Sequence, residues 1–316
     1  MTFNENALAS TQFHPSWFEG YRFVYPVVSR RANGVSLGVN LSPTKLCNFR
    51  CVYCQVERGE KRDEIARAVA TTAPERAASL DVLRGTPGVD CRADLDVLET
   101  ELSRLATATL DGSLFRVQRF ADVEASRRVL RDFAFSGDGE PTLAPQFPDA
   151  VSRLINVRKK INKDDLKLIL ITNATRLTRP EIVETLDRFD AANGEIWAKL
   201  DAGDPERFQA IDRAAIPFDA ILKNLEFAAS RWRVKIQTAL FLLRGQAPTA
   251  DEFARYSERI GEILAKGGRL ESVQLYTIAR VPAEPDAEPL DADAMDDYAA
   301  TLKRETGVPV EVFYSR

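Results

Sequence analysis

Residues 41–56, which read LSPTKLCNFRCVYCQV, decide how the rest of this sequence is interpreted. The stretch holds Cys47, Cys51 and Cys54, three of the four cysteines in 316 residues. The spacing C-x3-C-x2-C is compact enough for one loop to wrap three thiols around a single inorganic centre. Thiolates are soft ligands that suit zinc or an iron–sulfur cluster. The stretch therefore predicts a metal site.

A fourth protein ligand is hard to find in the sequence. A closed structural zinc site normally takes four ligands. The single histidine, His14, lies far upstream, where we expect a surface residue, and we interpret Cys91 as a structural or free thiol. A [4Fe–4S] cluster held by three cysteines keeps one iron open to a small molecule. A zinc-stapled loop and three ordinary buried thiols are the alternatives.

The string C-x3-C-x-aromatic-C, with Tyr53 before the last cysteine, resembles the radical S-adenosylmethionine (SAM) superfamily. Residues 29–56, SRRANGVSLGVNLSPTKLCNFRCVYCQV, resemble the branch of wyosine-type tRNA-modifying Fe–S enzymes. The resemblance implies a [4Fe–4S] cluster on Cys47, Cys51 and Cys54, with SAM bound to the open iron through its amino and carboxylate groups. It also implies cleavage of SAM to a 5′-deoxyadenosyl radical and a reductant such as a flavodoxin or ferredoxin.

Composition is that of an ordinary globular protein with a sizeable core, since 45% of residues are hydrophobic and 28% are charged. The few, clustered cysteines do not suggest a disulfide framework and fit a reducing, cytoplasmic location. Residues 1–10 lack the pattern of a secretory signal, and the apolar runs are too short to span a bilayer, so we expect no membrane partner. A single histidine excludes histidine triads.

Alternation of strand and helix patterns from residue 132 onward predicts an α/β fold. With a first strand at 35–41, strands are expected at 133–136, 166–172, 195–200, 234–242 and 272–278, separated by helices that include 150–161, 219–231 and 249–266. A capping box is predicted at Thr249, where the last of these helices begins, and another at Thr178, where a further helix begins. Such repetition requires parallel strands with right-handed crossovers. Six units suit a partial, open (β/α)6 barrel of the radical SAM type.

We expect three parts in the chain. Residues 1–34 form an aromatic-rich arm packed on the barrel. The barrel spans 35–280, with a mostly helical insertion at 57–131 that includes a helix at 121–131. Residues 281–316 form a short extension with a helix at 291–306 and a strand at 310–314. No short internal repeat is visible.

Polar residues follow several predicted strands, where α/β folds place ligands. SGDGEPT at 136–142 has two glycines that allow close approach of the backbone to a ligand. ITNAT at 171–175 ends the next strand, and alternation puts Lys199 and Asp201 on one face. The resemblance implies that the residues contacting SAM are Tyr53, Gly137, Asp138, Gly139, Glu140, Asn173, Lys199, Asp201, Gln237 and Tyr276. A glycine turn, an Asx turn, an ion pair or polar packing explains the same residues without a ligand.

The substrate stays open between a nucleoside or tRNA, a peptide and a small metabolite. The wyosine enzymes carry further cysteines upstream, whereas none precedes Cys47 here, and the net charge of −4 argues mildly against a broad nucleic-acid face. Arg30 and Arg31 form either a solvated turn or an anion contact near the cluster, and Arg280 is a candidate for lining the substrate opening. A non-catalytic binding module stapled by a metal is the alternative class.

Overall fold

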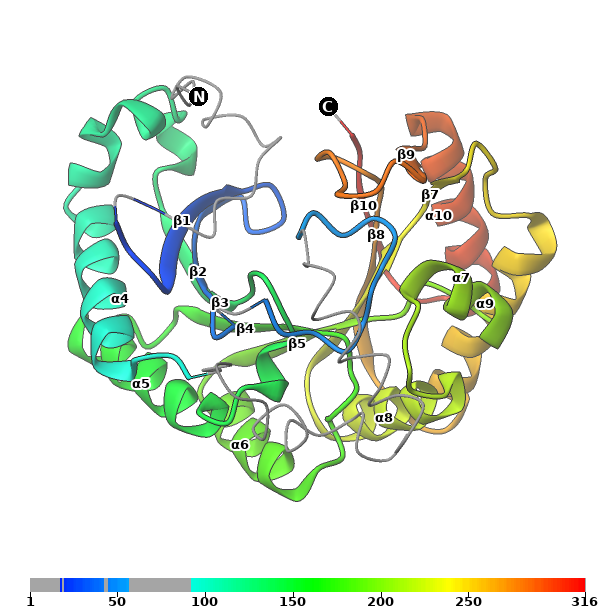
Figure 1. Ribbon diagram of the computed structural model, residues 1–316, viewed down its shortest axis with the longest axis horizontal. Coiled ribbons are helices and arrows are strands. Elements are labelled where there is room, and N and C mark those ends of the chain that lie inside the picture. Colours follow the sequence, from blue (N-terminus) through cyan, green and yellow to red (C-terminus); the bar gives the residue numbers. More distant parts are fainter. Residues whose placement is uncertain (1–17, 19, 43–44, 57–91, 316) are drawn as a thin grey trace.

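The computed structural model describes residues 18, 20–42, 45–56 and 92–315. Within them, an eight-stranded sheet curls into an open half-barrel with the strand order β1-β2-β3-β4-β5-β6-β8-β10. Helices cover its outer, convex face, and β1 and β10 border the open side (Figure 1). The predicted α/β partial barrel is therefore confirmed.

All strands of this sheet run parallel from β2 onward, and β1 is antiparallel to β2. They are β1 (Val24–Ser29), β2 (Gly34–Val39), β3 (Leu130–Phe135), β4 (Lys167–Thr172), β5 (Gly194–Lys199), β6 (Val234–Ala239), β8 (Leu270–Tyr276) and β10 (Val310–Phe313). The short strands β7 (Phe241–Leu243) and β9 (Ala287–Pro289) form a separate antiparallel pair. The α-helices are α4 (Leu95–Leu110), α5 (Phe147–Lys160), α6 (Pro180–Ala191), α7 (Pro205–Asp212), α8 (Phe218–Arg231), α9 (Ala250–Ala265) and α10 (Ala292–Thr306).

Burial on both faces explains why the central strands read as continuous apolar runs. Every residue of β2 is buried, and so are most residues of β4. Helix α9 begins at the predicted capping box, in which the Thr249 side chain and Glu252 exchange hydrogen bonds with the backbone. The capping box predicted at Thr178 is wrong, because its hydroxyl donates to Asn224 Oδ1 at 2.9 Å and α6 starts after Arg179 without a side-chain cap.

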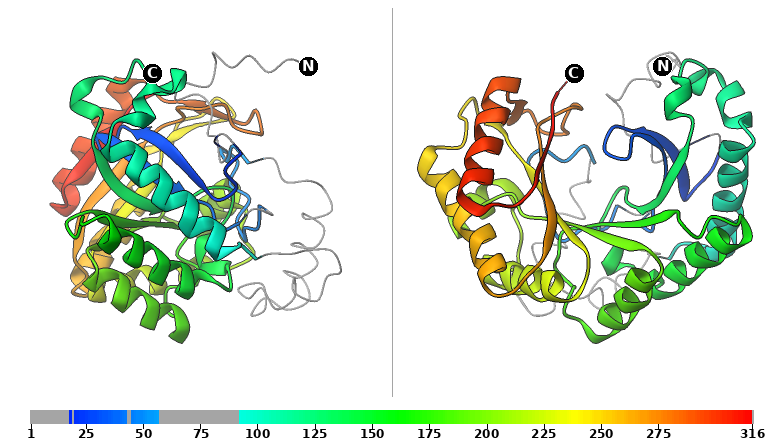
Figure 2. Two further views of the ribbon diagram at one scale, coloured as in Figure 1. Left: turned by 90° about the vertical axis from the view of Figure 1, so that its left-hand side faces the viewer. Right: turned by 180° about the vertical axis from the view of Figure 1, so that it is seen from behind.

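The sheet has two strands beyond the six of the predicted barrel, one at each edge, and the strand predicted at 310–314 in the extension is one of them. Residues 24–29 of the predicted arm form β1, in which Pro26 is tolerated because the strand lies at an edge. Strand β10 pairs in parallel with β8 and so continues the sheet. Figure 2 shows α4 on the outer side of the β1–β2 hairpin. His14, Cys91 and most of the predicted helical insertion lie outside the described residues.

The helix predicted at 121–131 is wrong. Residues 113–127 form short 3-10 turns, and β3 begins at Leu130. The Val129 carbonyl accepts the amide of Val35 at 2.8 Å, so pairing with β2 draws these residues out of a helix. No helix in the described part of the chain has the length and apolar character needed to cross a bilayer.

Candidate active site

A cavity of about 830 Å³ lies inside the half-barrel and brings the predicted site residues together. The three cysteines line it, and so do all the predicted SAM-contact residues except Asp201. These residues come from the loops after β2, β3 and β4 and from the ends of β5, β6 and β8. The carboxyl ends of parallel strands thus meet at one site, as expected for this class of fold.

The cysteine loop is held in place by α7. The Arg50 and Val52 amides donate to the carbonyls of Asp212 and Ile211, each at 2.9 Å. The buried Phe49 ring packs edge-on against Phe208, with ring centroids 5.5 Å apart. A backbone ladder and an aromatic contact therefore fix the middle of the loop.

The three thiols open onto the same cavity but are not gathered into a ligand set. In the described part of the chain, no three His, Cys, Asp or Glu side chains form a group that could hold a metal ion. Lys199 Nζ lies 3.0 Å from Cys51 Sγ, and Asn173 Nδ2 lies 3.8 Å from Cys47 Sγ. Burial raises the pKa of Cys51, and Lys199 opposes that shift. Soft thiolate donors that line one cavity fit an iron–sulfur cluster by their chemistry.

A buried charged cluster lies behind the cysteine loop. Lys199 Nζ is 3.4 Å from Asp201 Oδ2 and 3.7 Å from Asp212 Oδ1. Asp201 accepts hydrogen bonds from the Tyr53 hydroxyl at 2.5 Å and from the Ala239 amide at 2.7 Å, so it supports the cavity wall without lining it. Burial and then Asp201 raise the pKa of Asp212, whose carboxylate makes no hydrogen bond with the described residues. Sequence reasoning missed Asp212.

Both glycines of the GDGE segment allow close contact with the residues that follow β2. Gly137 has a φ of +128°, and a Cβ there would lie 2.8 Å from the Asn40 side chain. A Cβ on Gly139 would lie 2.0 Å from the Leu46 carbonyl oxygen, which accepts the Glu140 amide at 3.0 Å. Asn40 Nδ2 also donates to Asp138 Oδ2 at 2.9 Å. Asn40 was not predicted, although a polar residue directly after a strand is a usable signal.

The Glu140 carboxylate points into the protein and organises the next loop. It accepts hydrogen bonds from the Thr142 hydroxyl at 2.6 Å, the Thr172 hydroxyl at 2.7 Å and the Asn173 amide at 2.7 Å. Burial raises its pKa. Ala174 follows with a φ of +64°, a conformation that favours glycine. The geometry makes Glu140 a positioning residue for Asn173.

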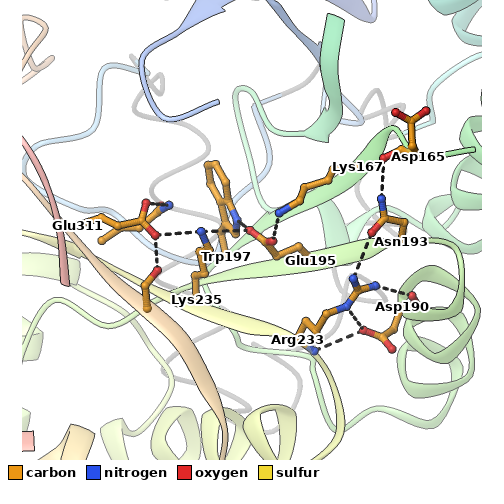
Figure 3. A network of polar contacts seen from close by, with 11 residues as sticks. Asp165, Lys167, Asp190, Asn193, Glu195, Trp197, Arg233, Lys235 and Glu311 are labelled. Atoms are coloured by element: carbon orange, nitrogen blue, oxygen red, sulfur yellow. Dashed lines mark hydrogen bonds and ion pairs between the residues drawn. The ribbon is translucent and has the colours of Figure 1, made fainter. Parts of the chain in front are cut away.

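The inward face of β5 shows how the interior is layered. Glu195, Trp197 and Lys199 alternate along it and share one face. Near the start of the strand, Glu195 pairs with Lys167 at 2.7 Å and accepts from Trp197 Nε1 at 2.5 Å, as Figure 3 shows. The Trp197 side chain forms an apolar shelf in the cavity with Ala134, Ile169 and Ile171. Lys199, at the end of the strand, lines the cavity beside Cys51.

The remaining predicted contacts face the cavity from the other side. Gln237 Nε2 donates to Gln274 Oε1 at 2.9 Å. The Tyr276 hydroxyl lies 3.3 Å from that of Tyr53. Ser36 and Asp132 also line the cavity, joined by a hydrogen bond of 2.5 Å, and the sequence reasoning had not singled them out.

Comparison with known sequences gives distant relatives. No model of a protein family matches the chain. A GTPase Obg from Brachyspira hyodysenteriae is 24% identical over 289 residues, 91% of this chain and 34% of that protein. A UPF0026 protein from Helicobacter pylori is 23% identical over 272 residues, 85% of this chain and 70% of that protein. The chain therefore spans about a third of the first relative, and it contains no Gly-Lys pair for the phosphate loop of a GTPase.

Comparison with solved structures bears on the fold. Spore photoproduct lyase, a double mutant with bound AdoMet and dinucleoside spore photoproduct, has a TM-score of 0.50 at 10% identity, covering 99% of this chain and 81% of that one. TYW1 with a lysine-pyruvate adduct has a TM-score of 0.47 at 16% identity, covering 86% of this chain and 74% of that one. The chain therefore shares the partial-barrel fold of spore photoproduct lyase.

Proposed function

We propose that the chain is a radical SAM enzyme that abstracts hydrogen from a substrate held inside the half-barrel. The observation that carries this proposal is the convergence of three thiols and the predicted SAM contacts on one cavity of about 830 Å³. A fold shared with a protein that has bound AdoMet supports it. The reaction needs one electron from a reductant such as a flavodoxin or ferredoxin.

Cys47, Cys51 and Cys54 are the residues that would hold a [4Fe–4S] cluster. When bound, the cluster and SAM supply reductive cleavage of the sulfonium and a 5′-deoxyadenosyl radical. Lys199 places a positive charge 3.0 Å from Cys51 Sγ, which stabilises the thiolate form that binds metal. Cys51, Asp201 and Asp212 raise the pKa of Lys199 against the opposing effect of burial, so its ammonium stays charged at neutral pH.

The strand ends would orient SAM. Backbone carbonyls near Gly137 and Gly139 suit an ammonium group, because no side chain shields them. Glu140 fixes the Asn173 amide, and so the side chain of Asn173 at the cavity wall. The apolar shelf around Trp197 excludes water from one side of the cavity and suits a ring or an aliphatic group.

Anaerobic reconstitution tests the proposal directly. We expect about four iron and four sulfide per chain and, with SAM and dithionite, formation of 5′-deoxyadenosine detected by mass spectrometry. Cys54→Ala should lose the iron–sulfur content and the formation of 5′-deoxyadenosine. Cys91→Ser, the matched control outside residues 41–56, should keep both. Zinc in place of iron, together with no SAM cleavage, would reject the proposal and favour a metal-stapled binding module. RNA that co-purifies with the protein would favour a tRNA guanosine as the substrate over a peptide or small metabolite.

A further inference from the structure

We propose that Arg31, with Arg30 and Arg280 beside it, forms a subsite for an anionic group of the substrate, a carboxylate or a phosphate. All three arginines line the cavity that the cysteines line. The inference rests on the proposed function only in calling the ligand a substrate. The binding of an anion at these arginines follows from their geometry and does not depend on the proposed activity.

The Arg31 guanidinium is held in place by aromatic rings. Its central carbon lies 4.6 Å from the centroid of the Tyr276 ring and 5.5 Å from that of Phe313. Among the described residues, this side chain has no hydrogen bond or ion pair beside these ring contacts. The N–H donors of a guanidinium lie in its own plane, so a ring that contacts its face does not use them. Their fork-like arrangement matches a carboxylate or phosphate.

Three like charges gather at this place. Arg30 Nη1 donates to the Tyr314 carbonyl at 2.6 Å, and Arg280 Nη1 lies 3.4 Å from Gln55 Oε1. Burial lowers the pKa of Arg31 and of Arg280, and repulsion between the arginines adds to the shift of each. Tyr276 and Glu311 oppose the shift of Arg31, and Tyr25 opposes that of Arg280. A bound anion relieves this repulsion and replaces the water lost by burial.

Acidic groups nearby are committed elsewhere. Glu311, a carboxylate on the neighbouring strand, pairs with Lys235 at 2.9 Å and accepts from Ser272 at 2.5 Å. In the cavity, Asp132 accepts from Ser36, and Asp138 accepts from Asn40. The arginines therefore face a cavity whose own carboxylates already have partners.

The subsite lies one aromatic ring away from the cysteine loop. Arg31 lies over Tyr276, whose hydroxyl is 3.3 Å from that of Tyr53 in the loop. The Ala283 amide donates to the Cys54 carbonyl at 2.9 Å, which joins the segment after Arg280 to the same loop. An anion held by Arg31 would place the rest of its molecule within the cavity, in front of the cysteines.

Binding of simple anions tests the subsite. Inorganic phosphate and succinate are titrated by calorimetry into the whole purified chain without reductant, so the two kinds of anion are compared. We expect the wild type to bind at least one of them, and Arg31→Gln to weaken that binding about tenfold or more, the size of a lost charged hydrogen bond. Arg31→Lys keeps the charge but not the fork and should be intermediate. Arg119→Gln is the matched control, because Arg119 lies over the Phe120 ring at 5.3 Å outside the cavity.

Two outcomes of this titration would overturn the anion site: a wild type that binds neither anion, or an Arg31→Gln variant with the wild-type melting temperature that binds as the wild type does. Repeating the titration with saturating SAM separates the sources of the anion. Unchanged affinity supports a substrate subsite, whereas competition assigns the arginines to the SAM carboxylate and rejects it. Failure to form 5′-deoxyadenosine, with anion binding intact, would reject the proposed function and leave the anion site standing.

Discussion

Gly139 sets how closely the loop after β3 approaches the cysteine loop. A Cβ at this position would lie 2.0 Å from the Leu46 carbonyl oxygen and 2.7 Å from Ser42 Oγ. The carbonyl belongs to the backbone and cannot rotate away, so Gly139→Ala should push the two loops apart. We expect a loss of about 1–3 kcal/mol in the free energy of unfolding, measured by urea titration, and a lower iron content after reconstitution.

Gly261 provides the matched control, because a Cβ there meets nothing within 4 Å. It lies inside α9, where Gly261→Ala should stabilise the protein by about 0.5–1 kcal/mol. If Gly139→Ala unfolds at the same urea concentration as the wild type, the close contact between the loops does not exist in solution.

At the residue scale, the sequence predicted which residues gather but not which way they point. The GDGE string, which was predicted to approach a ligand after a strand, lines the cavity. The direction of Glu140 depends on Thr172, which is 32 residues away, and nothing local in the sequence specifies that contact. Asp201 likewise lies near Lys199, 3.4 Å from its ammonium, yet its carboxylate accepts hydrogen bonds from Tyr53 and the Ala239 amide and does not line the cavity.

At the element scale, the central strands were predictable because burial on both faces makes their sequences continuously apolar. The strands at the edges of the sheet lack this pattern. Strands such as β4 are apolar on both faces, and this pattern needs no knowledge of neighbours. The sequence analysis places β1 in an aromatic-rich arm, and Pro26 weakens the strand pattern of these residues. Its place is set by the next strand, β2, and by helix α4, which is distant in the sequence.

Glu101 on α4 is the link that fixes the edge strand. Its carboxylate, only 7% exposed, accepts the amides of Arg22, Phe23 and Val24 at 2.7, 2.9 and 3.0 Å. In Glu101→Gln one oxygen becomes an NH2 group that faces backbone donors. We expect a loss of about 2–3 kcal/mol in the free energy of unfolding, from hydrogen bonds to a charged acceptor that are lost in a buried place, measured by urea titration.

Glu99, on the same helix, gives the comparison. Its carboxylate pairs at the surface with Lys160 at 2.6 Å and with Arg153. Glu99→Gln should cost about 1 kcal/mol or less, as exposed ion pairs do. Equal losses in the two variants would mean that Glu101 contributes only surface charge and does not anchor β1.

At the scale of the whole molecule, a half-barrel that keeps a cavity must also bury charge in its interior. Glu195 is balanced by Lys167 at 2.7 Å and Lys235 at 3.7 Å, and Glu311 by Lys235 at 2.9 Å (Figure 3). Asp132, 4% exposed on β3, has only the Ser36 hydroxyl at 2.5 Å as a hydrogen-bond partner in the described part of the chain. Of these three carboxylates, Asp132 is therefore the one whose charge is least compensated.

Asp132 should make the protein less stable as the pH rises. Burial raises its pKa from 3.8 to about 6, while Ser36 opposes the shift. Because the folded state holds this proton more tightly than the unfolded chain, the contribution of Asp132 to the free energy of unfolding falls between about pH 4 and pH 6 and stays low above that range.

Asp132→Asn removes the charge and keeps an acceptor for Ser36. We expect it to be more stable than the wild type at pH 8 by up to about 3 kcal/mol, with the difference shrinking toward pH 4. Urea titrations at pH 4.5, 6 and 8 measure the difference. Ser36→Ala, which removes the opposing hydrogen bond, should extend the decline to higher pH. If the free energy of unfolding of the wild type and of Asp132→Asn changes with pH in the same way, this carboxyl titrates normally and water reaches it in the folded protein.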